Sequence, residues 1–334
     1  MVGQDSHMEC LPWNGCHLLW LGGVDAERGK VVKRIASANT NTRLGFTLIE
    51  VMVVLGVVSL LTALLLPAVQ KARESARRIE CLSRVRQLAL AAHQFQDLHG
   101  HLPSGTELTE MSSGIPTYRS WITRLLPHLD SSALYDSIES AYRDSPDSPF
   151  RSERHGEFKK ALAHVSCPSD PRASKPQFCE VFGITAGMTS YIGSTGTNNR
   201  LQDGVFFGGS QIRFRDIRDG LSNTLLIGER PPSADFRFGW WYAGVGLDGK
   251  GLLDHHLGSA ELNTWESGCR LGPYSLGFGS DRTGHCGQFQ YWSYHDQSVT
   301  FALSDGSVRG ISEIDTAVFT ALGSRSGGEV ISEW

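Results

Sequence analysis

A long run without any charged side chain, from Val51 to Val69, constrains the fold of this 334-residue chain more than any other feature. As a helix that rises about 1.5 Å per residue, the run is roughly 28 Å long, close to the thickness of the hydrocarbon core of a bilayer. A single acidic residue, Glu50, stands immediately before it. The sequence therefore predicts a membrane-spanning helix over about residues 46–69.

The flanking charges predict how this helix is oriented. Five basic residues and no acidic residue lie between Arg28 and Arg43, so by the positive-inside rule the leader stays in the cytoplasm and the chain beyond Val69 is exported. An ordinary secretory signal is cut at small residues after its apolar core, whereas here the charged stretch QKARE continues the helix. Gly45 precedes the core instead, and cleavage after it leaves the apolar segment on the mature protein.

The sequence GFTLIE at positions 45–50 resembles the class III signal of type IV pilins and type II secretion pseudopilins. The resemblance implies that a prepilin peptidase cuts after Gly45 and methylates the new amino terminus, Phe46. It also implies a kink at Pro67, because such pilins often carry a proline at this distance from the cleavage site. A proline inside a helix lacks the amide hydrogen that the ladder needs.

Glu50 is the residue whose position demands an explanation. A carboxylate inside hydrocarbon costs about 2.5–3.5 kcal/mol on insertion scales, so an intramembrane acid suggests a function. The resemblance implies that Glu50 pairs with the charged amine of Phe46 in a neighbouring subunit, which would set the axial register of packed helices. The alternative is an ordinary signal anchor whose glutamate lies among the lipid headgroups.

Three regions follow from this pattern: a leader (1–45), a pilin-type helix (46–100) and an extracytoplasmic part (101–334). The first 27 residues show no structural pattern, and we expect translation to begin near Val31 or Val32 at a non-Met codon. A genuine N-terminal extension is the alternative.

The second half of the predicted helix is amphipathic. Apolar residues recur there at spacings of three and four, which is typical of a helix with one buried face. The expected stripe consists of Ile79, Leu82, Val85, Leu88, Ala92 and Phe95. Gly100 and Pro103 end the helix. A sheet formed by the C-terminal sequence is the expected partner of this stripe.

The remainder predicts short helices followed by strands. Segments 120–127 and 132–138 are expected to be helical, with Pro127 between them. From Met188 onward the apolar period becomes two, with Asp-Gly turn signals, and residues 298–303 and 307–311 form an expected antiparallel hairpin. The predicted fold class is α+β: one long N-terminal helix packed on an antiparallel β-rich head.

A second resemblance covers nearly the whole mature chain. In order, the chain is similar to the DUF1559 family of pilin-like proteins at RIEC (78–81), SW (120–121), CPSD (167–170), SY (190–191), DGLSNT (219–224), GE (228–229) and an H-X9-DG element (295–306). The biochemical activity of that family is undefined. The family usually reads His-Pro-Gly-Gly, whereas here His295 is followed by Asp-Gln-Ser, so a role tied to those glycines does not carry over.

Two sets of residues are candidate metal ligands. His295 and Asp305 span roughly 33 Å along a strand at about 3.3 Å per residue, so they share one ion only if the chain doubles back. Asp305 is better explained as a turn residue before Gly306, and His295 as a hydrogen-bonded residue at the start of a strand. Zinc ligands from the segments Asp254–His256 and His285–Cys286 together with Cys269 lack any CxxC spacing. No cofactor and no metal are expected.

Five cysteines lie in the exported part, where thiols tend to oxidise. They permit at most two disulfides, with fifteen possible choices. The preferred set is Cys81–Cys167, which ties the helix to the head, and Cys269–Cys286, which closes a loop. Cys167–Cys179 is the rival of the first bond, and five free thiols are the remaining alternative.

The overall composition argues against several functions. The formal net charge is −4 and the basic residues of the exported part are scattered, so no nucleic acid is expected as a partner. No Ser-His-Asp order, phosphate-binding loop or paired carboxylates suggest an enzyme. Aromatic clusters at 236–242 and 289–294 indicate core packing more than a binding surface.

Two hypotheses remain. The first is a non-enzymatic, single-pass subunit of the inner membrane, which packs through its N-terminal helix against other pilin-like subunits in a pilus or a type II secretion-type pseudopilus. The alternative is an anchored extracytoplasmic enzyme or ligand-binding module that does not polymerise.

Overall fold

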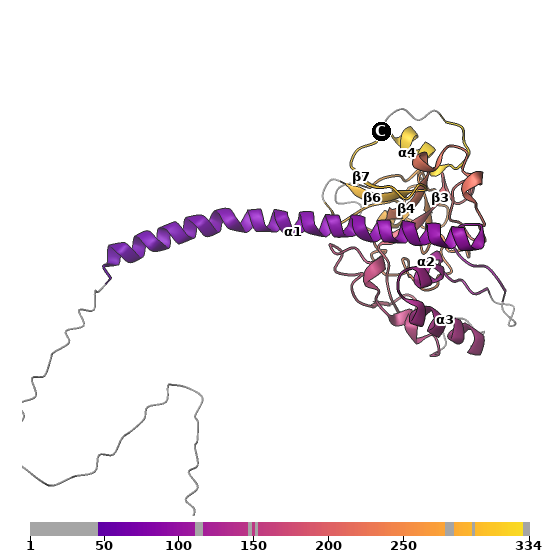
Figure 1. The fold of residues 1–334 in the computed structure, drawn as a ribbon, viewed down its shortest axis with the longest axis horizontal. Helices are drawn as coiled ribbons and strands as arrows, with labels where there is room; N and C mark the ends of the chain where they lie inside the picture. Colours follow the sequence, from indigo (N-terminus) through magenta and orange to yellow (C-terminus); the bar gives the residue numbers. More distant parts are fainter. Residues whose placement is uncertain are drawn as a thin grey trace, which may run out of the picture. The chain divides into compact units, whose positions relative to one another are not determined.

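The computed structural model describes residues 46–110, 116–145, 149–150, 153–277, 284–295 and 298–329. The predicted leader, with the cleavage-site residue Gly45, lies outside these residues. Contacts divide the chain into two compact units, 1–58 and 59–334. Figure 1 shows the elements along the chain. The helices are α1 (Leu48–His99), α2 (Trp121–Leu125), α3 (Ser132–Asp144) and α4 (Thr316–Gly323), and the strands are β1 (Gln177–Cys179), β2 (Ile184–Ala186), β3 (Tyr191–Gly196), β4 (Leu225–Glu229), β5 (His256–Gly258), β6 (Val299–Leu303) and β7 (Val308–Ile311).

Helix α1 is continuous through Pro67. Every residue from Leu48 to Arg73 is exposed, including apolar side chains such as Leu64, which is 66% exposed. Within the described part of the chain, α1 is the helix that is long and apolar enough to cross a membrane. An apolar surface of this size requires lipid or other apolar helices as its surroundings.

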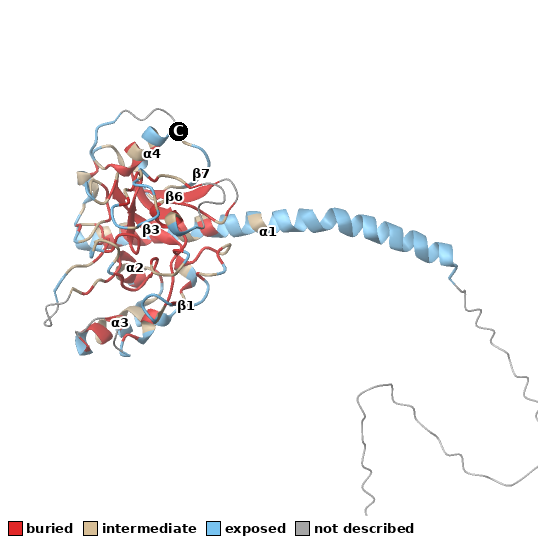
Figure 2. Ribbon diagram, turned by 180° about the vertical axis from the view of Figure 1, so that it is seen from behind, coloured by how far each residue is buried: buried red, intermediate tan, exposed pale blue. Residues whose placement is uncertain are grey.

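One face of the second half of α1 is buried in the head (Figure 2), while the other faces stay exposed. The buried residues are Cys81, Val85, Leu88, Ala89, Ala91, Ala92 and Phe95. The predicted stripe is therefore confirmed from Val85 onward, but its first member is wrong, because Ile79 is 68% exposed. At roughly 100° per residue, Ile79 points about 160° away from Cys81. From Ile79 to Leu88 the predicted stripe advances in steps of three residues, and each step falls short of the helical turn of about 3.6 residues. Its early members therefore lie on a different face from the buried one.

A five-stranded sheet forms the centre of the head, in the order β5-β3-β4-β6-β7. Neighbouring strands are antiparallel except β3 and β5, which are parallel. The predicted hairpin is confirmed: β6 and β7 pair with Val299 opposite Ile311. The turn between them contains Gly306 at φ +80°, a conformation that glycine adopts without strain. The predicted α+β class is likewise confirmed, with one parallel strand pair added.

Both faces of this sheet are buried along β3, β4, β5 and β6, whereas the edge strand β7 is partly exposed. Along β6, Ala302 belongs to the apolar core that contains the buried face of α1, whereas Phe301 and Leu303 belong to a second core with Phe319 of α4. Alternation between two cores follows from the two-residue period of a strand. The aromatic clusters fill these cores, as the packing interpretation predicted. The buried members include Phe238, Trp240, Trp241, Tyr242, Phe289, Tyr291 and Trp292.

Short helical segments and a small sheet complete the head. Pro127 lies between the helices α2 and α3, as predicted. It lies inside a 3₁₀ turn, η1 (Leu126–His128), that continues α2, and proline is tolerated in the first turn of such a segment because its missing N–H would have no helical partner there. The other 3₁₀ turns are η2 (Gly156–Lys159), η3 (Ala163–Val165), η4 (Phe214–Asp216), η5 (Leu221–Asn223) and η7 (His285–Phe289). Strands β1 and β2 form a separate antiparallel pair.

The buried face of α1 is expected to contribute to the stability of the head, because it forms part of one of the two apolar cores. Leu88→Ala is expected to lower the free energy of unfolding by about 2–5 kcal/mol, because it removes a fully buried side chain and leaves a cavity. Leu90→Ala is the matched control on the same helix. Leu90 is 57% exposed, so the expected change is within about 0.5 kcal/mol. Urea unfolding of the detergent-solubilised protein, followed by tryptophan fluorescence, measures both, and equal losses would contradict the assigned face.

Candidate functional site

The first turn of α1 is closed by a reciprocal pair of hydrogen bonds. The backbone N–H of Thr47 donates to Oε2 of Glu50 at 2.8 Å, and the backbone N–H of Glu50 donates to Oγ1 of Thr47 at 3.3 Å. The Thr47 hydroxyl also donates to the same Oε2 at 2.9 Å. This is a capping box, in which two otherwise unpaired helix N–H groups are satisfied.

The capping box gives Glu50 a role that the sequence analysis missed, although the spacing T-x-x-E is its signature. Unsatisfied backbone donors are especially costly in a membrane, because no water is present to bind them. Phe46, the expected mature amino terminus, is 83% exposed next to this cap. The capped turn therefore presents Phe46 and Glu50 at one end of the apolar half of α1.

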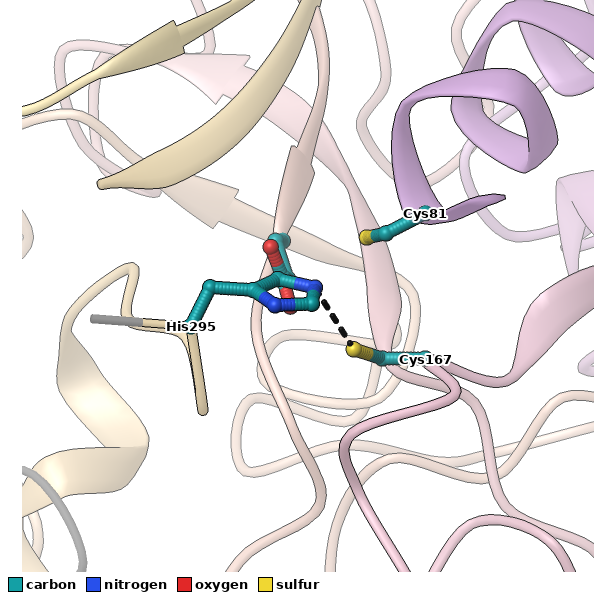
Figure 3. A group of neighbouring side chains, drawn as sticks. Cys81, Cys167 and His295 are labelled. Carbon is teal, nitrogen blue, oxygen red and sulfur yellow. Dashed lines mark hydrogen bonds between the residues drawn. The ribbon is translucent and has the colours of Figure 1, made fainter. Parts of the chain in front are cut away.

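A second site lies inside the head, where four potential metal ligands from four segments converge. Figure 3 labels three of them, Cys81, Cys167 and His295. Cys81 comes from α1, Cys167 follows η3, Glu229 ends β4, and His295 lies between η7 and β6. All four are buried, and their donor atoms lie within 4.8 Å of one another. Residues separated by more than two hundred positions in the chain therefore form one compact group.

Strand pairing and hydrogen bonds position the two thiols. Cys81 Sγ lies 3.2 Å from the hydroxyl of Tyr191, and Tyr191 pairs with Glu229 across β3 and β4. Cys167 Sγ lies 3.3 Å from Nε2 of His295, the bond drawn in Figure 3. The backbone N–H of Cys167 donates to Oγ of Ser190 at 2.9 Å, which anchors this loop to the start of β3.

The histidine and the glutamate are also oriented by their surroundings. His295 Nδ1 is 2.7 Å from Oε1 of Glu74 on α1, and the Ser169 hydroxyl donates to the same oxygen at 3.0 Å. Glu229 Oε2 accepts the backbone N–H of Thr300 at 3.3 Å. Its other oxygen, Oε1, is buried and has no hydrogen-bond partner among the described residues.

The group is strongly coupled electrostatically. The hydrogen bond from the Cys167 thiol lowers the pKa of Cys81 to about 5 against the effect of burial, and the same bond raises the pKa of Cys167. Burial, reinforced by the charge of Cys81, raises the pKa of Glu229 to about 8. Burial by itself lowers the pKa of His295, but hydrogen bonding to Cys81 and the negative charge of Glu229 outweigh it and raise the pKa to about 9. The pKa of Cys81 is therefore lowered, whereas those of Cys167, Glu229 and His295 are raised.

The expected disulfide between Cys81 and Cys167 is not formed in the structure, where both are free thiols. The two residues are brought together as predicted, but the Tyr191 hydroxyl and the His295 ring each contact one of the sulfurs. The rival Cys167–Cys179 bond is not formed either, because Cys179 is also a free, buried thiol.

The second expected disulfide is present. Cys269 and Cys286 are bonded across a sequence separation of 17 residues, so neither thiol belongs to a zinc site with the neighbouring histidines. His285 Nε2 lies 3.1 Å from Oε2 of Glu266, and His255 Nδ1 lies 2.8 Å from the hydroxyl of Thr106. The zinc set considered from the sequence is not assembled.

Asp305 and His295 occupy different places in the head. The carboxylate of Asp305 accepts the backbone N–H of Ser307 at 2.8 Å, a contact that stabilises the turn, as predicted from Gly306. His295 is hydrogen-bonded, as predicted, but it lies in the cysteine cluster and not at the start of β6. The sequence did contain a signal for the cluster: Cys81, Cys167, Glu229 and His295 each fall in one of the motif fragments that carry the DUF1559 resemblance.

Two family models match the chain. A model described as a protein of unknown function (DUF1559) matches residues 70–315, which is more than half of the chain and includes the whole cysteine cluster. A model of the prokaryotic N-terminal methylation motif matches residues 40–66. No curated protein and no solved structure matches the chain.

The Cys269–Cys286 bond is expected to stabilise the head. In the chain-entropy view, a bond that closes a loop of this length contributes about 3 kcal/mol. The double variant Cys269→Ala/Cys286→Ala should lower the free energy of unfolding by about 2–4 kcal/mol. Urea unfolding is the measurement, and wild-type protein with its bond selectively reduced is the matched control. A double variant as stable as the oxidised wild type would contradict the assignment.

Proposed function

The chain belongs to the DUF1559 family, and from this premise we propose that it is a prepilin-like structural subunit without enzymatic activity. Its methylation motif implies processing by a prepilin peptidase. The proposed product is a mature chain that begins at Phe46, carries a methylated amine and assembles through α1 into a pilus or a type II secretion-type pseudopilus. Its long apolar helix fits a single-pass membrane anchor, and its signal fits the cell envelope.

One observation carries this proposal: α1 has an apolar half that no other described residue covers. Residues from Leu48 to Arg73 are exposed, whereas those from Cys81 to Phe95 include the face packed in the head. A lipid bilayer supplies the missing apolar surroundings before assembly. Equivalent helices of other subunits supply them in a fibre, because close packing of apolar helices buries the same side chains.

Glu50 supports assembly more specifically. The Glu50 carboxylate accepts the backbone N–H and the hydroxyl of Thr47 through the same oxygen, Oε2, so the second carboxylate oxygen is directed to partners outside the turn in this proposal. The charged amine of Phe46 in an adjacent subunit is the proposed partner. In apolar surroundings, a carboxylate left without its charged partner is strongly destabilising. Packing of the helices is therefore favoured only in the axial register that brings Glu50 next to the amine of Phe46.

Substitution at Glu50 separates its charge from its capping role. Glu50→Gln retains the capping box, because glutamine also serves at this position, but it removes the charge. The variant is expected to be inserted and cleaved, yet to form no fibres or misregistered ones. Electron microscopy of sheared surface material and immunoblots of membranes are the measurements.

Thr47→Ala is the matched control, because it removes the capping hydroxyl and keeps the carboxylate. Its expected cost is about 0.5–2 kcal/mol of helix stability, with fibres retained. Normal fibres from Glu50→Gln would contradict the proposed charge pairing.

Processing makes a separate prediction. Intact-mass analysis of the wild-type protein should give a chain that begins at Phe46 and carries one additional methyl group. Gly45→Leu should accumulate as the uncut precursor, because a branched side chain replaces a residue that has none at the scissile bond. A mature N-terminus located beyond Val69 would exclude the proposed anchor, since the apolar segment would then be lost.

A further inference from the structure

We propose that Cys81, Cys167, Glu229 and His295 bind one Zn²⁺ ion in a closed, four-ligand structural site. Two sulfurs, one imidazole nitrogen and one carboxylate oxygen form the donor set. Each of these is an established zinc ligand, and a site with four protein ligands is typical of structural zinc. This inference concerns the head alone and does not depend on fibre assembly.

The spacing of the donor atoms suits a tetrahedral ion. Zinc bonds of about 2.3 Å to sulfur and about 2.0–2.1 Å to nitrogen or oxygen place neighbouring donors roughly 3.3–3.8 Å apart. Cys167 Sγ and His295 Nε2 already lie 3.3 Å apart, and all four donors lie within 4.8 Å of one another. Contraction by about 1 Å, within the range of side-chain rotation, closes the site.

The surroundings of the donors are those of a metal site. His295 directs Nε2 into the cluster because its Nδ1 is held by Glu74 at 2.7 Å. A carboxylate behind a ligating histidine fixes its tautomer and increases its basicity. Tyr191, 3.2 Å from Cys81, can donate a hydrogen bond to a thiolate at that position.

Glu229 supplies an independent observation. The residue is fully buried, and its Oε1 has no hydrogen-bond partner among the described residues. Buried carboxylate oxygens normally have a partner, because an unpaired buried polar atom is costly. A cation bound to Oε1 would provide that partner while Oε2 keeps its bond to Thr300.

The donor types select the metal. Calcium and magnesium require oxygen-rich sites, whereas two thiolates with one imidazole favour zinc among the common divalent ions. The bound ion would join α1 to three separate segments of the head. It would also keep the two adjacent thiols from being oxidised to a disulfide, which is the competing state of this pair.

The first test uses the full-length protein, solubilised from membranes without a polyhistidine tag and kept from oxidants. Elemental analysis should find one zinc per chain. Replacement by Co²⁺ should give the intense visible bands of tetrahedral cobalt and a thiolate-to-metal charge-transfer band. A chain without stoichiometric metal that also fails to bind added Zn²⁺, or a Cys81–Cys167 disulfide in the protected protein, would overturn the proposal. The cobalt spectrum is measured on the wild-type protein, so this test remains valid even if a variant fails to fold.

Variants then test the individual ligands. Cys81→Ser and Glu229→Gln should each weaken zinc binding by more than about 100-fold, beyond the range of residues that only support a ligand. Cys179→Ser is the matched control, a free and buried cysteine outside the cluster, and it should bind zinc as the wild type does. Unchanged affinity in Glu229→Gln, or lost affinity in Cys179→Ser, would refute the four-ligand site.

Glu74 is a positioning residue in this proposal. Glu74→Ala should weaken zinc binding by about 10–100-fold. Glu74→Gln should restore most of the affinity, because its amide oxygen can still accept the N–H of His295. Competition with a chromophoric chelator measures both variants, and equal affinity of the alanine variant and the wild type would show that Glu74 does not support the metal.

Discussion

Helix α1 requires two different surroundings along one continuous backbone, and the rest of the structure depends on this division. Its first half exposes apolar side chains that no part of the described chain covers, and its second half inserts Val85, Leu88 and Phe95 into the core of the head. A helix satisfies its backbone N–H and C=O groups by its own hydrogen bonds in both environments. The helix can therefore continue without a break from the exposed apolar half to the half packed in the head. The head is therefore built directly on the continuation of the anchor.

The start of α1 and the cysteine cluster both contain polar groups that need partners. At the start of α1, the Thr47–Glu50 capping box satisfies backbone donors that apolar surroundings would leave unpaired. In the head, Cys81 and Glu74 bring polar side chains of the same helix against Cys167 and His295. The cap is exposed, whereas all four residues of the cysteine cluster are buried, where hydrogen bonds and charges are stronger because water is excluded.

Local patterns predicted α1, α2, α3 and the β6–β7 hairpin, and the errors have physical explanations. The hairpin of β6 and β7 follows from alternation and an Asp-Gly turn, both of which lie within a few residues. Ile79 was assigned to the buried face by spacing alone, although the helical period places it on the opposite side. Cys81 and Cys167 were expected to meet, but which other side chains surround them depends on contacts across the whole head.

The amino-acid sequence by itself identified an apolar helix that fits a membrane anchor and the methylation motif beside it, because these depend on length, hydropathy and local residue order. It also determined the strand hairpin and the amphipathic face, which depend on short periods. Only the tertiary structure decided that Cys81, Cys167, Glu229 and His295 form one site. The reason is that strand order and helix docking bring together residues whose separation in the chain carries no information about their distance in space.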